Sequence, residues 1–294
     1  MRRFLALLIL LGFLCGCVPD TEPSQIAATT LPVYEFTTRL CQGTGITVTR
    51  LITESVSCLH DYSLQVNQMR AMESAQWIVI NGGGLEEFLH DALHGSQKIL
   101  DASAGMELLC PETDHAHEHD AHNDHGHHHE QDPHIWLSPV RATEMATVIC
   151  NGLCTGYPEH EALFRKNLTS LLQDLKDLQT YGENELRDLS CRELVTFHDG
   201  FAYLAESFGL TVLEAVEEES GSEASAAELI HLINIVHEHR LPAIFTETNG
   251  STAAAHTIAI ETGISVYALD MVMAGESYFD AMYRNIDTLK EALG

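Results

Sequence analysis

The chain alternates between short apolar runs and stretches in which apolar residues recur at spacings of three and four, and the alternation occurs twice. The short runs predict buried strands, and the spacing of three and four predicts helices with one buried face. Strands are expected at residues 26–29, 46–52, 77–81 and 98–101, and again at 194–197, 211–214, 243–246 and 266–269. Helices are expected at 32–40, 67–75, 200–208, 224–239, 252–262 and 277–293.

Strands that alternate with helices are typical of parallel sheets covered by helices on both faces. Because the pattern repeats, we predict an α/β fold of two lobes, each a parallel sheet flanked by helices. Residues 159–189 carry leucines at helical spacing and predict one long helix that joins the lobes, with a bend at Gly182. The predicted domains are an N-terminal lobe at 17–157, the linking helix at 158–189 and a C-terminal lobe at 190–294.

The first residues have the character of a targeting segment. Two arginines precede an apolar stretch at residues 4–13 that is too short to span a membrane, so residues 1–16 are predicted to be a signal peptide. Leu14-Cys15-Gly16-Cys17 resembles a bacterial lipobox, although Cys15 stands where Ala or Ser is usual. We therefore expect lipidation of Cys17 and an exported lipoprotein that is anchored in the membrane at the cell surface or in the periplasm. Simple cleavage and release is the alternative.

The charge of the chain is strongly negative. There are 15 basic and 43 acidic residues, and the formal net charge is −28. Such a field repels nucleic acid and concentrates cations, so we expect no nucleic-acid partner. The six cysteines after Cys17 match no zinc-ribbon spacing, and Cys150 and Cys154 share one helical face, which favours packing over a disulfide bridge.

Residues 114–131 hold eight histidines among Asp, Glu, Asn and Gly, without any apolar period. This composition predicts a solvated loop rather than a packed element. Imidazole is the commonest protein ligand for late transition metals, so we interpret the segment as a metal-attracting loop. A solubilising insert without a metal role is the alternative. The loop leads directly to the apolar segment 132–139, in which Ser138-Pro139 predicts the start of a helix.

Residues with metal-ligating side chains stand close to the ends of the predicted strands. In parallel α/β sheets, ligands bind beyond the carboxyl ends of the strands. The candidates are His60, His134, His198, Glu247 and Asp270. Three imidazoles and one carboxylate form a tetrahedral set that suits zinc better than magnesium or calcium. Asp61 and Asp199, each adjacent to a candidate histidine, are predicted to orient the imidazoles.

Several segments together resemble the zinc-binding receptors of bacterial ABC importers, within the zinc/manganese solute-binding protein family. The resemblance extends over about residues 25–293. The matching segments are His60-Asp61-Tyr62, the acidic histidine-rich insert, 132–139, 197–204, 223–226, 244–247 and 277–282. It implies two α/β lobes joined by one long helix, with the metal site in the cleft between the lobes.

The resemblance also implies the ligands and the function. His60, His134 and His198 would bind the metal, with Asp270 as the fourth ligand and Glu247 or water as alternatives. Manganese-type relatives tend to carry Glu in place of the third histidine, so His198 favours zinc. The expected function is capture of Zn²⁺ and its delivery to the membrane permease of an ABC transporter by a monomeric, non-enzymatic receptor. A receptor for manganese or another divalent metal, and a zinc-buffering or adhesin-like lipoprotein, are the alternatives.

A zinc hydrolase is a further alternative, from a different functional class. It would use Glu247 as the general base, but the chain contains no HExxH motif.

Overall fold

The computed structural model describes residues 25–54, 59, 62–89, 98–110, 131–216 and 224–294. The predicted signal peptide, Cys17, His60 with the neighbouring Asp61, and all of the histidine-rich loop except Gln131 lie outside the described residues. Cys58 lies outside them as well.

The N-terminal lobe contains a four-stranded parallel sheet. Its strands are β1 (Ile26–Ala28), β2 (Val48–Arg50), β3 (Trp77–Ile80) and β4 (Lys98–Asp101), in the order β2-β1-β3-β4. The connecting helices are α1 (Leu31–Leu40), α2 (Val66–Ser74) and the short 3-10 helix η1 (Glu87–Leu89). The central strand β1 is wholly buried, as its uninterrupted apolar sequence predicts for a sheet covered on both faces.

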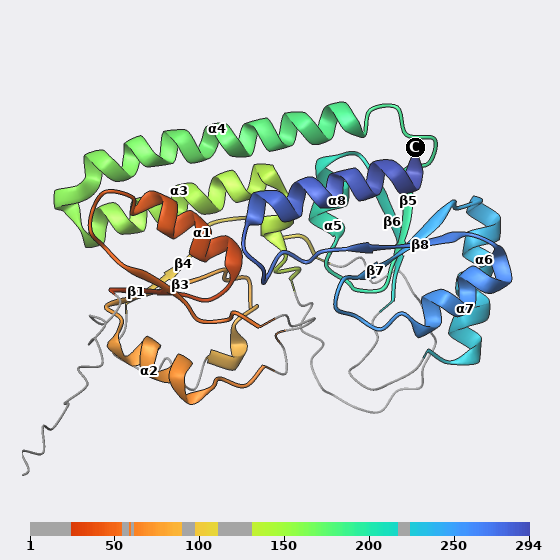
Figure 1. Cartoon of the computed structure of the whole chain (residues 1–294), viewed down its shortest axis with the longest axis horizontal. Helices are drawn as coiled ribbons and strands as arrows, with labels where there is room; N and C mark the ends of the chain where they lie inside the picture. The colour runs from red at the N-terminus through yellow and green to blue at the C-terminus, as the bar shows by residue number, and fades with distance from the viewer. Residues whose placement is uncertain (1–24, 55–58, 60–61, 90–97, 111–130, 217–223) are drawn as a thin grey trace, which may run out of the picture.

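The C-terminal lobe repeats this arrangement with the same strand order. Its strands are β5 (Glu193–Thr196), β6 (Thr211–Ala215), β7 (Ala243–Glu247) and β8 (Ser265–Leu269), in the order β6-β5-β7-β8, and all pairings are parallel. The helices are α5 (Ala202–Ser207), α6 (Ala226–His239) and α7 (Ala253–Thr262), the last two at the outer end of the lobe (Figure 1). The predicted two-lobed α/β fold is therefore confirmed.

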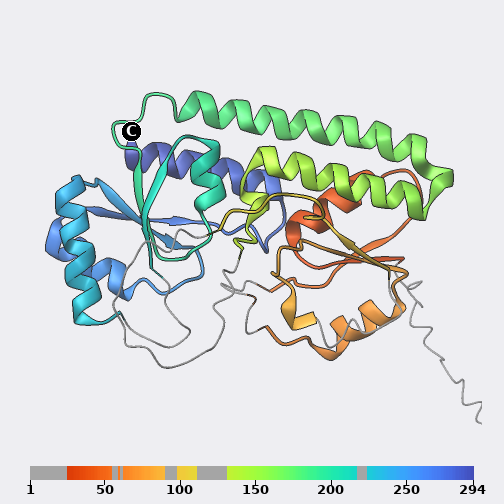
Figure 2. The ribbon, with the colours of Figure 1, turned by 180° about the vertical axis from the view of Figure 1, so that it is seen from behind.

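Three long helices run along one side of both sheets. Helix α4 (Glu161–Glu185) extends across the two lobes, and α3 (Pro139–Gly156) and α8 (Tyr278–Leu293) lie between it and the sheets (Figures 1 and 2). The 3-10 helices η2 (Ile135–Leu137) and η3 (Pro158–His160) flank α3. Helix α4 continues through Gly182 and ends four residues before the predicted end. A Cβ atom on Gly182 would lie 2.3 Å from the ring of Phe208, so this glycine permits close packing of α4 against the C-terminal lobe.

The lobes share much of their hydrophobic interior. The larger cluster of buried side chains contains β1, α1 and α3 residues of the first lobe together with β5, α5 and α8 residues of the second. Cys150 and Cys154 are buried in this cluster and carry free thiols, as predicted from their shared helical face. Within the described part of the chain, the helices are too short or too polar to cross a bilayer.

Candidate metal centre

His134 lies in a short buried turn immediately before η2. It is only 6% exposed, and Ser138, which follows η2, caps the N-terminus of α3 by accepting a hydrogen bond from the backbone N–H of Arg141. Asp132 Oδ1 accepts hydrogen bonds from the backbone N–H of His134 at 2.9 Å and from its ring Nδ1 at 2.8 Å. Because an ionised carboxylate can only accept, Nδ1 carries a proton, and in the neutral form of the ring Nε2 then has the lone pair. This is the tautomer that binds a metal through Nε2.

His198 lies in the loop between β5 and α5. Its Nδ1 atom is 3.4 Å from Oε2 of Glu247, the last residue of β7, and its carbonyl accepts a hydrogen bond from the Thr196 hydroxyl at 3.0 Å. The strand order of this sheet reverses between β5 and β7. In open α/β sheets, ligands bind beyond the carboxyl ends of the strands at this reversal. His198 and Glu247 therefore stand where the topology favours a binding site.

The two histidines meet at the junction of the lobes. Their ring centroids are 5.4 Å apart and their planes are nearly perpendicular, at 84°. A Cβ atom on Gly200 would lie 3.0 Å from Cε1 of His134 and 2.8 Å from Cδ2 of His198. Both carbons are ring atoms adjacent to Nε2, and Cε1 is adjacent to Nδ1 as well, so one edge of each ring borders the space beside Gly200. Two imidazoles that face one small space can ligate the same ion.

Glu247 is a buried carboxyl group beside this pair, only 3% exposed. Burial, and to a smaller extent the negative charge of Asp270, together raise its pKa to about 8. Without a cation nearby, Glu247 therefore holds its proton at neutral pH. A bound divalent cation would favour the ionised carboxylate, which is the form that ligates metal.

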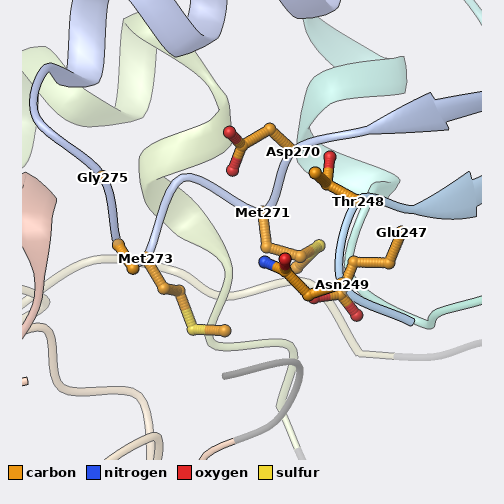
Figure 3. Close-up of a pocket in the computed structure, with 8 residues that line it drawn as sticks. Glu247, Thr248, Asn249, Asp270, Met271, Met273 and Gly275 are labelled. Atoms are coloured by element: carbon orange, nitrogen blue, oxygen red, sulfur yellow. The ribbon is translucent and has the colours of Figure 1, made fainter. Parts of the chain in front are cut away.

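Asp270 lies at the end of β8 and lines a cavity of about 100 Å³ together with Glu247, Asn249, Met271 and Met273. Its carboxylate points away from Glu247 (Figure 3). Oδ1 accepts the backbone N–H of Val272 at 2.7 Å, and Oδ2 is 3.7 Å from Nη2 of Arg284 on α8. These contacts direct Asp270 toward α8, whereas Glu247 is directed toward His198.

The structure thus brings together His134, His198 and Glu247 but leaves the predicted ligand set incomplete. Within the described ranges, no three His, Cys, Asp or Glu side chains are arranged to hold a metal ion. The third predicted histidine, His60, lies outside those ranges. The assignment of His60, His134, His198 and Asp270 as ligands stays a prediction.

A comparison with known protein families identifies the family of this chain. The profile of the ZnuA family, "Zinc-uptake complex component A periplasmic", matches residues 26–292. The chain belongs to this family. The match covers both lobes and the long helix, so the whole described architecture is that of a ZnuA-type protein.

Known relatives agree with this placement. The zinc-binding lipoprotein AdcA of Streptococcus pneumoniae (strain ATCC BAA-255 / R6) is 31% identical over 95% of this chain, but the match spans only 58% of AdcA. The chain thus spans little more than half the length of this curated relative. A crystal structure of ZnuA has a TM-score of 0.77 at 25% identity and covers 92% of this chain and 100% of its own. The Zn(II)-bound ZnuA-like domain of S. pneumoniae AdcA has a TM-score of 0.74 at 28% identity and covers 91% and 98%.

Two residues of the site were not predicted from the sequence. Asp132 orients the His134 ring from two positions away, whereas the prediction considered only carboxylates adjacent to a histidine, Asp61 and Asp199. The signal was the spacing Asp-Pro-His, which lets an aspartate accept the N–H groups of the residue two positions on. Gly200 follows Asp199 in the sequence, but its place between two rings from different lobes has no local signature.

Proposed function

We propose that this protein is an extracytoplasmic receptor that captures Zn²⁺ and delivers it to the membrane permease of an ABC importer. The observation that carries the proposal is the pair His134 and His198, whose rings approach from different lobes to a centroid distance of 5.4 Å beside Gly200. Its membership of the ZnuA family and the zinc-binding name of AdcA support the choice of metal.

The proposed ligands are His60, His134 and His198, with a carboxylate as the fourth. Asp270 and Glu247 are the candidates, and the Glu247 carboxyl group lies 3.4 Å from Nδ1 of His198, where it can orient that ring as Asp132 orients the ring of His134. Asp270 contacts the backbone N–H of Val272 and lies 3.7 Å from Arg284, and its carboxylate oxygens retain lone pairs for a metal ion. Three imidazoles favour zinc over manganese, which prefers oxygen ligands. Zinc binds deprotonated imidazole, so affinity decreases as the pH falls through the histidine range, near pH 6.5.

The remaining elements of the proposal concern location and delivery. Acylation of Cys17 would tether the chain to the outer side of a membrane, close to the permease. The histidines of 114–131 would collect ions weakly and pass them to the tight site. We expect the receptor to act as a monomer. Catalysis forms no part of the proposal, because the family consists of uptake-complex components rather than enzymes.

The proposal is tested by titrating the mature chain, with and without residues 114–131, with Zn²⁺ against Mn²⁺. We expect one tight zinc site per chain that persists without the loop and is lost in His60→Ala, His134→Ala and His198→Ala. The matched control is His256→Ala, because His256 is exposed on α7, away from the candidate site. If the chain prefers manganese, the proposed cargo is manganese instead of zinc. If the chain without residues 114–131 has no tight site, the receptor hypothesis is overturned.

A metal buffer that binds zinc but serves no importer is the main rival. Growth of a deletion strain at limiting zinc separates the two functions. A receptor predicts a growth defect that excess zinc rescues and that the His198→Ala variant fails to complement. A buffer predicts normal growth at limiting zinc.

A further inference from the structure

Leu109 and Asp132 lie on either side of the segment 111–130, and their backbones are hydrogen-bonded to each other. We call this pair of residues the neck. The backbone N–H of Asp132 donates to the carbonyl of Leu109 at 2.8 Å. The two chain segments are therefore held together at this point, two residues before His134.

A side chain of the other lobe binds both partners of the neck. The hydroxyl of Tyr203, on α5, accepts a hydrogen bond from the backbone N–H of Leu109 at 2.8 Å and donates one to the carbonyl of Asp132 at 3.1 Å. A phenol has one proton to donate and oxygen lone pairs to accept with, so this geometry satisfies both of its roles. Tyr203 is fully buried, and burial raises its pKa to about 12, so the hydroxyl stays protonated wherever histidine titrates.

The neck connects directly to the candidate ligand. The same Asp132 whose carbonyl accepts from Tyr203 holds the His134 ring through its carboxylate, at 2.8 Å from Nδ1. A shift of the Asp132 backbone therefore moves the group that sets the orientation and tautomer of His134. Tyr203 belongs to the same loop and helix segment as His198 and Gly200, so one segment carries one histidine and fixes the support of the other.

We propose that Tyr203 is a positioning residue for metal binding, which holds Asp132 and thereby aligns His134 of the N-terminal lobe with His198 of the C-terminal lobe. The inference rests on the proposed zinc function. Tyr203 touches no metal ligand atom itself and acts through Asp132. Removal of a group that holds a ligating histidine in place typically weakens metal binding by about tenfold to hundredfold.

The test compares Tyr203→Phe with two controls in the full mature chain and in the chain lacking 114–131. Ser207→Ala removes another hydroxyl between α5 and the N-terminal lobe, which lies 2.7 Å from Ser138 Oγ and 2.8 Å from the backbone carbonyl of Tyr203, and leaves the bonds of the Tyr203 hydroxyl to the neck in place. Tyr157→Phe is the same chemical change at a buried hydroxyl that has no hydrogen-bond partner among the described residues. Zinc affinity is measured by competition with a chelator, and the site geometry by the visible spectrum of bound Co²⁺.

We expect Tyr203→Phe to weaken zinc binding by about tenfold or more and to alter the Co²⁺ spectrum, with both controls at the wild-type values. Hydrogen exchange at the Leu109 amide should become faster in Tyr203→Phe alone. Wild-type affinity and spectrum in Tyr203→Phe, whatever its melting temperature, would reduce the residue to a structural role and overturn the inference. If the wild-type chain itself has no tight zinc site, the proposed function is overturned, and this inference with it.

Discussion

Gly200 lies in close contact with both candidate histidines. An added methyl group would come within 3.0 Å of both histidine rings and within 2.6 Å of the Met271 Cε atom. Real Cβ contacts are longer than this, so the rings would have to separate. The absence of a side chain at Gly200 therefore allows the two rings to approach each other this closely.

We accordingly expect Gly200→Ala to weaken zinc binding by an order of magnitude or more, because a displacement of about 1 Å at a binding centre is enough to lose the aligned geometry. Chelator competition measures the change. Gly156→Ala is the control, because its Cβ would similarly crowd the ring of Trp77, at 2.7 Å, away from the site. Both variants should lose stability, and only Gly200→Ala should lose affinity. Equal affinities would show that Gly200 serves packing alone.

The buried carboxyl group of Glu247 makes a prediction about pH. Its pKa is about 8 in the folded protein and near 4.5 in the unfolded chain, so the folded state binds the proton more tightly. Stability of the metal-free protein therefore falls as the pH rises from about 4.5 to 8, by up to a few kcal/mol for this group. Glu247→Gln removes this loss. Its stability advantage should be small at pH 5 and largest at pH 8, as urea unfolding measures.

The exposed Glu183→Gln variant on α4 serves as the control and should follow the wild-type curve at every pH. A constant difference between Glu247→Gln and the wild type would mean that Glu247 titrates normally. The expected gain in stability is accompanied by weaker zinc binding if Glu247 is the fourth ligand.

At the scale of elements, the periodicity of the sequence located the described strands and the α-helices that connect them to within a few residues, whereas the 3-10 helix η1 was not predicted. Strand 98–101 was predicted with its observed bounds, because its apolar run is bounded by polar residues. Helix α4 ended at Glu185 rather than Leu189, since Leu186 still packs in the core after the helix has ended. Burial maintains the apolar spacing beyond the last turn, so spacing alone overestimates the helix.

The site was less predictable than the fold for a physical reason. Candidate histidines could be located because strand ends in parallel sheets are binding positions, which depends on local pattern. The choice between Glu247 and Asp270 depends on side-chain direction, and that is set by Arg284 and by the backbone of Val272. Such tertiary contacts leave no periodic signal in the sequence.

Gly182 supports a prediction about the packing of α4. Its missing side chain lets the buried ring of Phe208 approach the helix backbone, and a Cβ there would lie 2.3 Å from that ring. Gly182→Ala gains about 1 kcal/mol of helix propensity, but overpacking costs about 1–3 kcal/mol, so we expect net destabilisation. Ser170→Ala, at an exposed position of the same helix, should stabilise slightly. Urea unfolding measures both, and a stabilised Gly182→Ala variant would contradict the close packing.

At the scale of the whole molecule, the segment after β8 ties the two lobes together. The indole N–H of Trp136 donates to the carbonyl of Met271 at 2.7 Å, and the N–H of Leu31 donates to the carbonyl of Met273 at 3.0 Å. The hydroxyl of Tyr278 then donates to the carbonyl of Trp136 at 2.8 Å. Backbone groups of one lobe thus satisfy buried polar groups of the other, in addition to the shared hydrophobic core.

Because the core and these hydrogen bonds cross the lobe boundary, neither lobe can unfold without exposing the other. We expect calorimetry of the metal-free mature chain to show one cooperative transition, although chains of this length often unfold in steps. Zinc at a hundredfold excess over its dissociation constant should stabilise this whole transition by about 2.7 kcal/mol. The His198→Ala variant should retain a single transition and lose the zinc shift. Two transitions, of which zinc raises only one, would show instead that the lobes are energetically independent and that the metal stabilises one of them alone.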